Sequence, residues 1–127
     1  MSARVLAVDD SSSMRQMVRA ALEAEGLDVL EAANGREALD VLGADPVDLV
    51  ITDLYMPGMD GLALVQAIRQ QAEHRFTPIL VLTTEHADEF KQRGRVAGAT
   101  GWLVKPFRPE QLGQVVMRVL GAVRVRV

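Results

Sequence analysis

The amino-acid sequence predicts an α/β protein built around a parallel β-sheet. Apolar runs of strand length alternate five times with segments of helical period, and this alternation is typical of βα units. Four of the five runs are almost continuously apolar, as expected for strands that helices cover on both faces. Because parallel strands end at a common edge, polar residues that follow these runs are expected to gather into one site.

The strand-like runs are bounded by polar or turn residues. The second run is interrupted by Asp28 and Glu31, which predicts an edge strand. The five runs cover residues 5–8, 27–33, 49–51, 79–82 and 102–104.

The first three predicted helices begin at recognisable caps. Serines at positions 11–13 offer caps for the first helix, and Gly26 is expected to stop it. Asn34 with Glu37 three residues later resembles a capping box, and the third helix is expected to open near Asp60 and Gly61. Their apolar stripes are Met14, Met17, Val18, Ala21 and Leu22, then Ala38, Val41 and Leu42, then Leu64, Val65 and Ile68.

The last two predicted helices differ in the quality of their apolar faces. Pro109 fits the first turn of the final helix, whose stripe is the most regular in the chain. The fourth helix has a thin stripe with an internal glycine, which costs about 1 kcal/mol relative to alanine, so it is expected to be the least stable. The two stripes are Leu112, Val115, Val116, Val119, Leu120 and Val123, and Ala87, Phe90, Gly94 and Ala97.

Composition limits the class of protein. The 127 residues fit one domain, 1–127, and 49% hydrophobic with 24% charged residues is typical of a folded globular chain. The net charge of -3 argues against a DNA-binding surface, and the absence of cysteine excludes disulfides and thiolate metal sites. No apolar stretch has the roughly 18 residues of a membrane span, so we expect a cytoplasmic protein.

Five polar side chains stand where four apolar runs stop. They are Asp9, Asp10, Asp53, Thr83 and Lys105. Grouped carboxylates repel one another unless a cation neutralises them, and Mg²⁺ prefers such oxygen ligands. Together with a hydroxyl and an ammonium group, the carboxylates predict a site for a divalent cation and a phosphoryl group.

The same residues lie within longer matching segments. These segments are Asp9 with Asp10, residues 52–61, residues 82–85 and residues 97–107. In this order and spacing the chain resembles response-regulator receiver domains of two-component systems, specifically the stand-alone chemotaxis type typified by CheY. The resemblance implies a flavodoxin-like single domain with five helices and strand order 2-1-3-4-5, an order for which CheY is a standard example.

The resemblance also implies the chemistry of the site. Asp53 would be the phosphoacceptor nucleophile, and the donor would be a phosphohistidine on a histidine kinase or phosphotransfer protein, with acetyl phosphate as a small-molecule substitute. Asp10 and Asp53 would bind Mg²⁺ directly with the backbone carbonyl of Tyr55. In that scheme Asp9 acts largely through water.

The resemblance further implies a signalling switch with slow autodephosphorylation rather than a turnover enzyme. Lys105 and Thr83 would contact phosphoryl oxygens, and Thr83 and Trp102 would switch conformation. Helix 4, strand 5 and helix 5 would form the face read by a downstream protein, such as a flagellar motor switch component or a kinase.

Two positions depart from the usual chemotaxis pattern. Tryptophan stands at position 102, where tyrosine is common, and Tyr55 stands where a small amide is frequent. We expect Tyr55, Thr84 and Glu85 to modulate the approach of water to the phosphorylated site.

Other interpretations remain open at this stage. Asp9 and Asp10 can cap the first helix, and Lys105 precedes Pro106 at a bond that is commonly cis in receivers. His74 and His86 lie in polar contexts and are expected at the surface.

Alternative functions are a phosphate sink, a phosphorelay intermediate or a Mg²⁺-dependent phosphohydrolase of the haloacid dehalogenase type. That hydrolase class normally has an Asp-x-Asp pair and a cap region, whereas here the aspartates are adjacent and the chain is short. A non-catalytic module, either a degenerate receiver or a flavodoxin-like cofactor binder, is a further alternative. The intact acidic and lysine positions argue against a degenerate receiver, and the two aspartates would repel a flavin phosphate.

Overall fold

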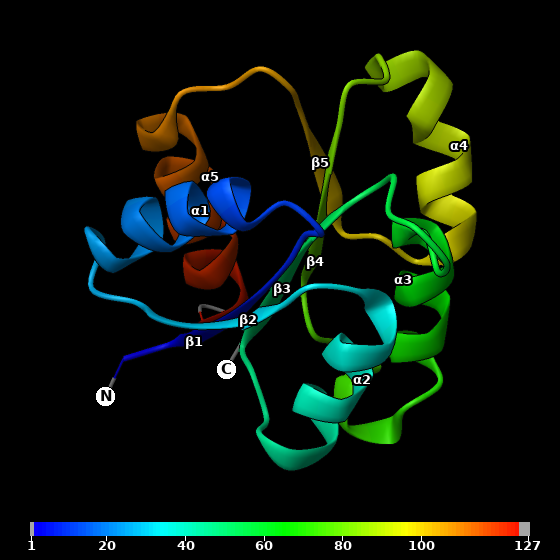
Figure 1. The fold of residues 1–127 in the computed structure, drawn as a ribbon, viewed down its shortest axis with the longest axis horizontal. Coiled ribbons are helices and arrows are strands. Elements are labelled where there is room, and N and C mark those ends of the chain that lie inside the picture. Colours follow the sequence, from blue (N-terminus) through cyan, green and yellow to red (C-terminus); the bar gives the residue numbers. More distant parts are fainter. Residues whose placement is uncertain (1, 125–127) are drawn as a thin grey trace.

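The computed structural model describes residues 2–124 and contains a five-stranded parallel sheet of order β2-β1-β3-β4-β5 (Figure 1). This order and the five βα units confirm the predicted fold class. The strands are β1 (Arg4–Val8), β2 (Asp28–Ala32), β3 (Leu49–Asp53), β4 (Ile79–Thr83) and β5 (Gly101–Val104).

Helices cover both faces of the sheet (Figure 1). One face carries α1 and α5, and the other carries α2, α3 and α4. Their bounds are α1 (Ser12–Glu23), α2 (Gly35–Ala44), α3 (Gly61–Arg69), α4 (Ala87–Ala97) and α5 (Pro109–Arg124), with a 3₁₀ turn, η1 (Ala72–His74), after α3. Among the described residues, no helix has the length and hydrophobicity needed to span a bilayer.

Each side of the sheet buries its own apolar layer. Strand residues alternate between the layers because successive side chains point to opposite faces. The α1/α5 layer includes Val5, Ala7, Leu22, Ile51, Leu82, Leu112 and Val116, and the opposite layer includes Leu6, Val8, Leu42, Val50, Leu64, Val81 and Phe90. The side chains of Ala87 and Val123, both assigned above to apolar stripes, lie outside the described part of the structure.

The strand predictions hold to within one or two residues. β2 is an edge strand, as its interrupted pattern predicts. β3 and β4 extend further than their apolar runs, to Asp53 and Thr83, because ladder pairing continues past the last apolar residue. The backbone N–H of Leu54 still donates to the carbonyl of Leu82 at 2.9 Å.

The predicted helix starts are also confirmed. The Ser11 hydroxyl accepts from the N–H of Met14 at 3.2 Å, and the Asn34 side chain accepts from the N–H of Glu37 at 2.8 Å. The Asp60 carboxylate accepts from the N–H of Ala63 at 2.8 Å. Each bond satisfies a donor that the first helical turn leaves unpaired.

Two glycines are required by close packing. A Cβ on Gly94 would lie 2.3 Å from the Phe90 ring, so the thin stripe of α4 reflects a ring packed across the helix. A Cβ on Gly61 would lie 2.3 Å from the backbone oxygen of Asp53. The start of α3 therefore packs directly on the end of β3, which fixes the backbone at Asp53.

The expectation that His74 lies at the surface is wrong, whereas His86 is exposed as expected. His74 is 1% exposed, and its Nδ1 lies 3.0 Å from the Thr77 hydroxyl. Arg69 closes this region by donating to the carbonyls of His74, Thr77 and Gly98 at 2.9, 2.6 and 3.0 Å. The polar sequence around His74 therefore does not place it at the surface, because the residue is buried beside carbonyls that Arg69 binds.

Candidate functional site

The strand order brings the five candidate side chains to one edge of the sheet. Asp53 and Thr83 are the last residues of β3 and β4, while Asp9 and Asp10 follow β1 and Lys105 follows β5. These four strands are neighbours and all run in the same direction. The five residues, although spread between positions 9 and 105, therefore converge at the carboxyl end of the sheet.

Three carboxylates form a compact cluster there. One oxygen each of Asp9, Asp10 and Asp53 lies within 4.8 Å of the others. Asp9 is buried, Asp53 partly buried and Asp10 exposed. Like charges at this separation destabilise one another, and burial increases the effect.

Asp9 carries the clearest electrostatic cost. Its Oδ1 accepts from the N–H of Ser11 at 2.9 Å, whereas its buried Oδ2 has no hydrogen-bond partner among residues 2–124. Burial raises the pKa of the Asp9 carboxyl above its ordinary value, and the nearby Asp53 charge adds to this, although the Ser11 bond opposes it. Ser11, not Asp9, is the residue at the helix cap.

The donor set fits a hard divalent cation. Three carboxylates offer the oxygen ligands that Mg²⁺ and Ca²⁺ prefer, and the orphaned Asp9 Oδ2 is a buried acceptor that a bound ion or its water would satisfy. A cation would also remove the repulsion within the cluster.

Lys105 supplies the nearby positive charge. Its Nζ lies 2.7 Å from Asp53 Oδ1, in an ion pair whose side chains are only 20% and 13% exposed. Its backbone N–H donates to the carbonyl of Thr83 at 2.7 Å, which ties the residue to the end of β4. The Lys105–Pro106 bond is cis, as the receiver resemblance implies.

The Thr83 side chain is buried and already engaged. It is 1% exposed, and its Oγ1 accepts from the backbone N–H of Glu85 at 2.9 Å. The hydroxyl thus holds the start of the β4–α4 loop against the end of the strand.

A polar bridge links the loop after β3 to the loop after β4 and to α4. The Tyr55 hydroxyl donates to Glu85, and the Arg93 guanidinium donates to both carboxylate oxygens of Glu85 at 2.8 and 3.0 Å. The Tyr55 bond, helped by Arg93, holds the pKa of Glu85 below its ordinary value. Sequence reasoning singled out Tyr55 and Glu85 but missed Arg93, because nothing in the spacing of α4 residues marks a partner for Glu85.

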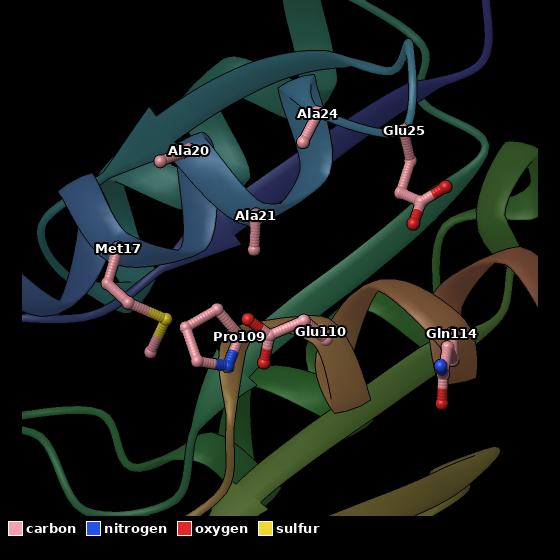
Figure 2. A pocket seen from close by; sticks show the side chains of 8 residues that line it. All are labelled: Met17, Ala20, Ala21, Ala24, Glu25, Pro109, Glu110 and Gln114. Carbon is pink, nitrogen blue, oxygen red and sulfur yellow. The ribbon is translucent and has the colours of Figure 1, made fainter.

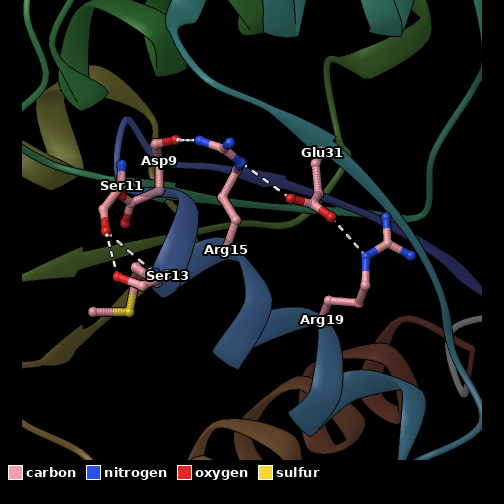
Figure 3. Close-up of polar contacts among 7 residues, drawn as sticks. Asp9, Ser11, Ser13, Arg15, Arg19 and Glu31 are labelled. Carbon is pink, nitrogen blue, oxygen red and sulfur yellow. Dashed lines mark hydrogen bonds and ion pairs between the residues drawn. The ribbon is translucent and has the colours of Figure 1, made fainter.

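A second network, missed at the sequence level, links Asp9 to α1 and β2 (Figure 3). Glu31 of β2 accepts from Nε of Arg15 at 3.0 Å and from Nε of Arg19 at 2.6 Å. Arg15 also donates to the backbone carbonyl of Asp9 at 2.6 Å. The sequence does not reveal these contacts, because Arg15 and Arg19 lie outside the apolar stripe of α1 and are equally acceptable as solvated residues.

Trp102 lies on β5 and is partly buried, as expected for its strand. Its ring packs against Phe90 of α4, with centroids 5.4 Å apart and planes tilted by 56°. This geometry is a favourable aromatic contact that joins β5 to α4.

A groove of about 510 Å³ lies between α1 and α5 (Figure 2). Alanines of α1, with Met17 and Pro109, form its apolar walls, and Glu25, Glu110 and Gln114 stand around it. None of the five strand-end residues lines the groove, so it is separate from the acidic cluster.

Comparison with known proteins agrees with this geometry. Residues 5–117 match the family model of the response regulator receiver domain. A chemotaxis protein CheY homolog of Campylobacter jejuni is 40% identical over 120 residues, covering 93% of this chain and 92% of that protein. The transcriptional regulatory protein SrrA of Staphylococcus aureus is 35% identical over 98% of this chain, which spans 49% of SrrA.

A solved structure of the chemotaxis protein CheY4 from Vibrio cholerae superposes with a TM-score of 0.90 at 52% identity, covering 94% of this chain and 99% of that one. Family, relatives, sheet order and strand-end cluster all agree. The chain belongs to the response-regulator receiver family and is of the CheY-like type.

Proposed function

We propose that this chain is a single-domain response regulator that accepts a phosphoryl group on Asp53 in a Mg²⁺-dependent reaction. The observation that carries the proposal is a cluster of three carboxylates, with oxygens within 4.8 Å of one another, in which Asp53 also pairs with Lys105 at 2.7 Å. A carboxylate is a competent nucleophile toward phosphorus, and the transfer needs positioning and positive charge more than further covalent chemistry. Asp53 sits where both are supplied.

The proposed cation ligands are Asp9, Asp10, Asp53 and the backbone carbonyl of Tyr55, with Asp9 acting through water. Bound Mg²⁺ supplies positive charge to a phosphoryl oxygen during transfer. Fixed strand ends hold the carboxylates in place before any ion arrives, so little ordering accompanies binding.

In the proposed transfer, an Asp53 oxygen forms a bond to phosphorus as the nitrogen–phosphorus bond of a phosphohistidine breaks. The electron pair of the broken bond stays on the imidazole nitrogen of the donor. Lys105 shifts its ammonium donor from the Asp53 carboxylate to a phosphoryl oxygen, and the Thr83 hydroxyl donates to another. The chain's own residues thus stabilise the charge that it receives.

The phosphoryl group would then switch the protein by drawing Thr83 inward. The Thr83 hydroxyl now accepts from the N–H of Glu85, so its rotation toward phosphate releases the start of the β4–α4 loop. Trp102 packs on Phe90 of α4 and lies beside β4, so a shift of this loop reaches the face formed by α4, β5 and α5. As the sole tryptophan, Trp102 would report the change in its emission.

We place the pathway in chemotaxis, in the cytoplasm, because of the similarity to CheY proteins over almost the whole chain. A histidine kinase or phosphotransfer protein would supply the phosphoryl group, and a flagellar motor switch component would read the switched face. A phosphate sink or phosphorelay intermediate is the competing role, because the motif encodes phosphorylation and not the docking partner.

Incubation with Mg²⁺ and a reactive phosphoramidate is expected to add a single phosphate to Asp53. Peptide mass spectrometry checks the position, and Asp53→Asn is the matched variant that should remain unmodified. A stoichiometry of one phosphate per chain fits a switch, whereas sustained hydrolysis of phosphate esters fits a hydrolase. An adduct at another residue, or none, contradicts the proposal.

Asp9→Asn is expected to stabilise the metal-free protein at neutral pH by roughly 1 kcal/mol, because it removes a buried charge from the cluster. Because the pKa of Asp9 is higher in the folded state than in the unfolded state, its ionised form lowers the free energy of unfolding at a pH above the folded-state pKa. This loss disappears as the pH falls below the unfolded-state pKa. Thermal melting in chelator should therefore show a higher Tm for Asp9→Asn than for wild type at neutral pH, and the difference in Tm should become smaller in acid.

Mg²⁺ is expected to remove this difference in Tm between Asp9→Asn and wild type at neutral pH, since an ion that binds only the folded wild type stabilises it. Asp40→Asn, which neutralises an exposed carboxylate of α2, is the control and should change little. A metal-free Asp9→Asn protein that melts below wild type at pH 7 would rule out the repulsive cluster.

Tyr55→Asn is expected to shorten the lifetime of the phosphorylated protein about three- to tenfold and to change Mg²⁺ affinity less. The substitution removes both the ring and its bond to Glu85, a loss of roughly 1 kcal/mol that opens the edge of the sheet to water. Decay of the phosphorylated protein after donor removal measures the lifetime.

Tyr55→Phe separates the two contributions, because it keeps the ring and loses only the hydroxyl. A lifetime shortened by Tyr55→Phe as much as by Tyr55→Asn assigns the effect to the Glu85 bond. Equal lifetimes in all three proteins would remove any role for Tyr55.

Affinity capture with phosphorylated wild type and with Asp53→Asn is expected to differ in one partner. A flagellar motor component retained only by the phosphorylated protein supports the chemotaxis role. Retention of a histidine phosphotransfer protein, with no motor component, would instead support a relay or sink.

A further inference from the structure

Arg15 places a permanent positive charge against the backbone of Asp9, one of the three cluster residues. It lies in the first turn of α1, and its Nη1 donates to the backbone carbonyl of Asp9 at 2.6 Å (Figure 3). Its side chain is only 17% exposed. The guanidinium therefore touches the backbone of a residue whose carboxylate belongs to the cluster, without bonding to that carboxylate.

The cluster is an attractive alternative partner for this arginine. A guanidinium offers five N–H donors in a planar fork that matches carboxylates, and Asp9 Oδ2 is a buried acceptor with no partner in the described part of the chain. An arginine paired with these carboxylates would occupy the oxygens and neutralise the charge that attract a divalent cation. Arg15 must therefore be held back if the site is to bind metal.

Glu31 is the group that holds it. Its Oε1 accepts from Nε of Arg15 at 3.0 Å, and its Oε2 accepts from Nε of Arg19 at 2.6 Å. Nη1 of Arg19 also donates to Oε2 of Glu23 at 3.2 Å. Glu31 stands on β2 opposite Ala7 of β1, so sheet pairing fixes the backbone from which the carboxylate reaches Arg15.

We propose that Glu31 is a positioning residue for the cation site, which holds Arg15 against the Asp9 carbonyl and away from the cluster carboxylates. The inference rests on the proposed Mg²⁺-dependent function. It predicts that the edge strand β2, which contributes none of the proposed ligands, controls metal affinity through an arginine. Glu31 acts by restraining a competitor of the cation.

Titration calorimetry of the metal-free protein with Mg²⁺ tests the proposal, at a fixed ionic strength near 0.15 M so that screening is constant. Glu31→Gln is expected to weaken Mg²⁺ binding about tenfold, the lower end of the usual effect of residues that orient metal ligands. In an Arg15→Gln background, Glu31→Gln should have no effect, because the competing guanidinium is gone. Melting curves in chelator check that each variant is folded.

Glu23→Gln is the matched control, because it removes a carboxylate from the same network with the same change of net charge. It should leave Mg²⁺ affinity within about twofold of wild type, since surface charges contribute little. Equal weakening by Glu23→Gln and Glu31→Gln would overturn the proposal, because net charge alone would then explain the effect.

The double-mutant cycle distinguishes restraint from simple electrostatics. If Glu31→Gln weakens binding by the same factor with and without Arg15, the two residues act independently and the proposal fails. Wild-type affinity in Glu31→Gln overturns this inference alone. Absence of Mg²⁺ binding to wild type overturns the proposed cation site as well, which separates the two failures.

Discussion

The repulsion among three carboxylates at the end of the sheet is the constraint on which the rest of the site depends. Asp9, Asp10 and Asp53 are brought within 4.8 Å by strands that are locked by backbone pairing and by apolar layers on both faces. The framework fixes the backbone positions from which the three carboxylates extend. The burial of apolar side chains in two layers offsets the free energy lost to repulsion among the carboxylates. Because of that repulsion, a charge added at this edge of the sheet changes the energy of the carboxylates.

In the part of the chain that the structure describes, one ammonium group is paired with this cluster. Lys105 pairs with Asp53 at 2.7 Å, whereas the buried Oδ2 of Asp9 has no partner in the described residues. The site is therefore under-neutralised by construction. A cation and a phosphoryl group together would complete it, because the cation satisfies the carboxylates and the phosphoryl group gives Lys105 a new acceptor.

Sequence reasoning predicts the parts of the molecule that repeat a simple pattern. Buried parallel strands are continuous apolar runs, so β1, β3, β4 and β5 and the residues after them are found directly. Caps at Ser11, Asn34 and Asp60 are equally local, because each side chain bonds a backbone N–H three residues on. The convergence of the five candidate residues follows from the common strand direction together with the strand order, and that order is predicted from the family resemblance.

Contacts between side chains of distant elements escape such reasoning. The Arg15–Glu31 and Glu85–Arg93 pairs join positions 16 and 8 residues apart, and either arginine is equally acceptable as a solvated residue. His74 is buried where Arg69 donates to the backbone carbonyls of His74, Thr77 and Gly98, an arrangement that no periodicity marks. These features depend on the assembled fold, which sets the reach of each long side chain.

Arg69 and Arg15 show how one side-chain type serves opposite purposes. Arg69 donates to three backbone carbonyls and the Thr100 hydroxyl, and it ties α3, η1, the residues before β4 and the loop before β5 together. Its hydrogen bonds make that region rigid. Arg15 instead donates to Glu31 and to the Asp9 carbonyl, and it makes no hydrogen bond to a cluster carboxylate in the described part of the chain. The two arginines therefore differ in their surroundings, since Arg69 binds carbonyls near the amino ends of β4 and β5 and Arg15 binds the carbonyl that follows β1.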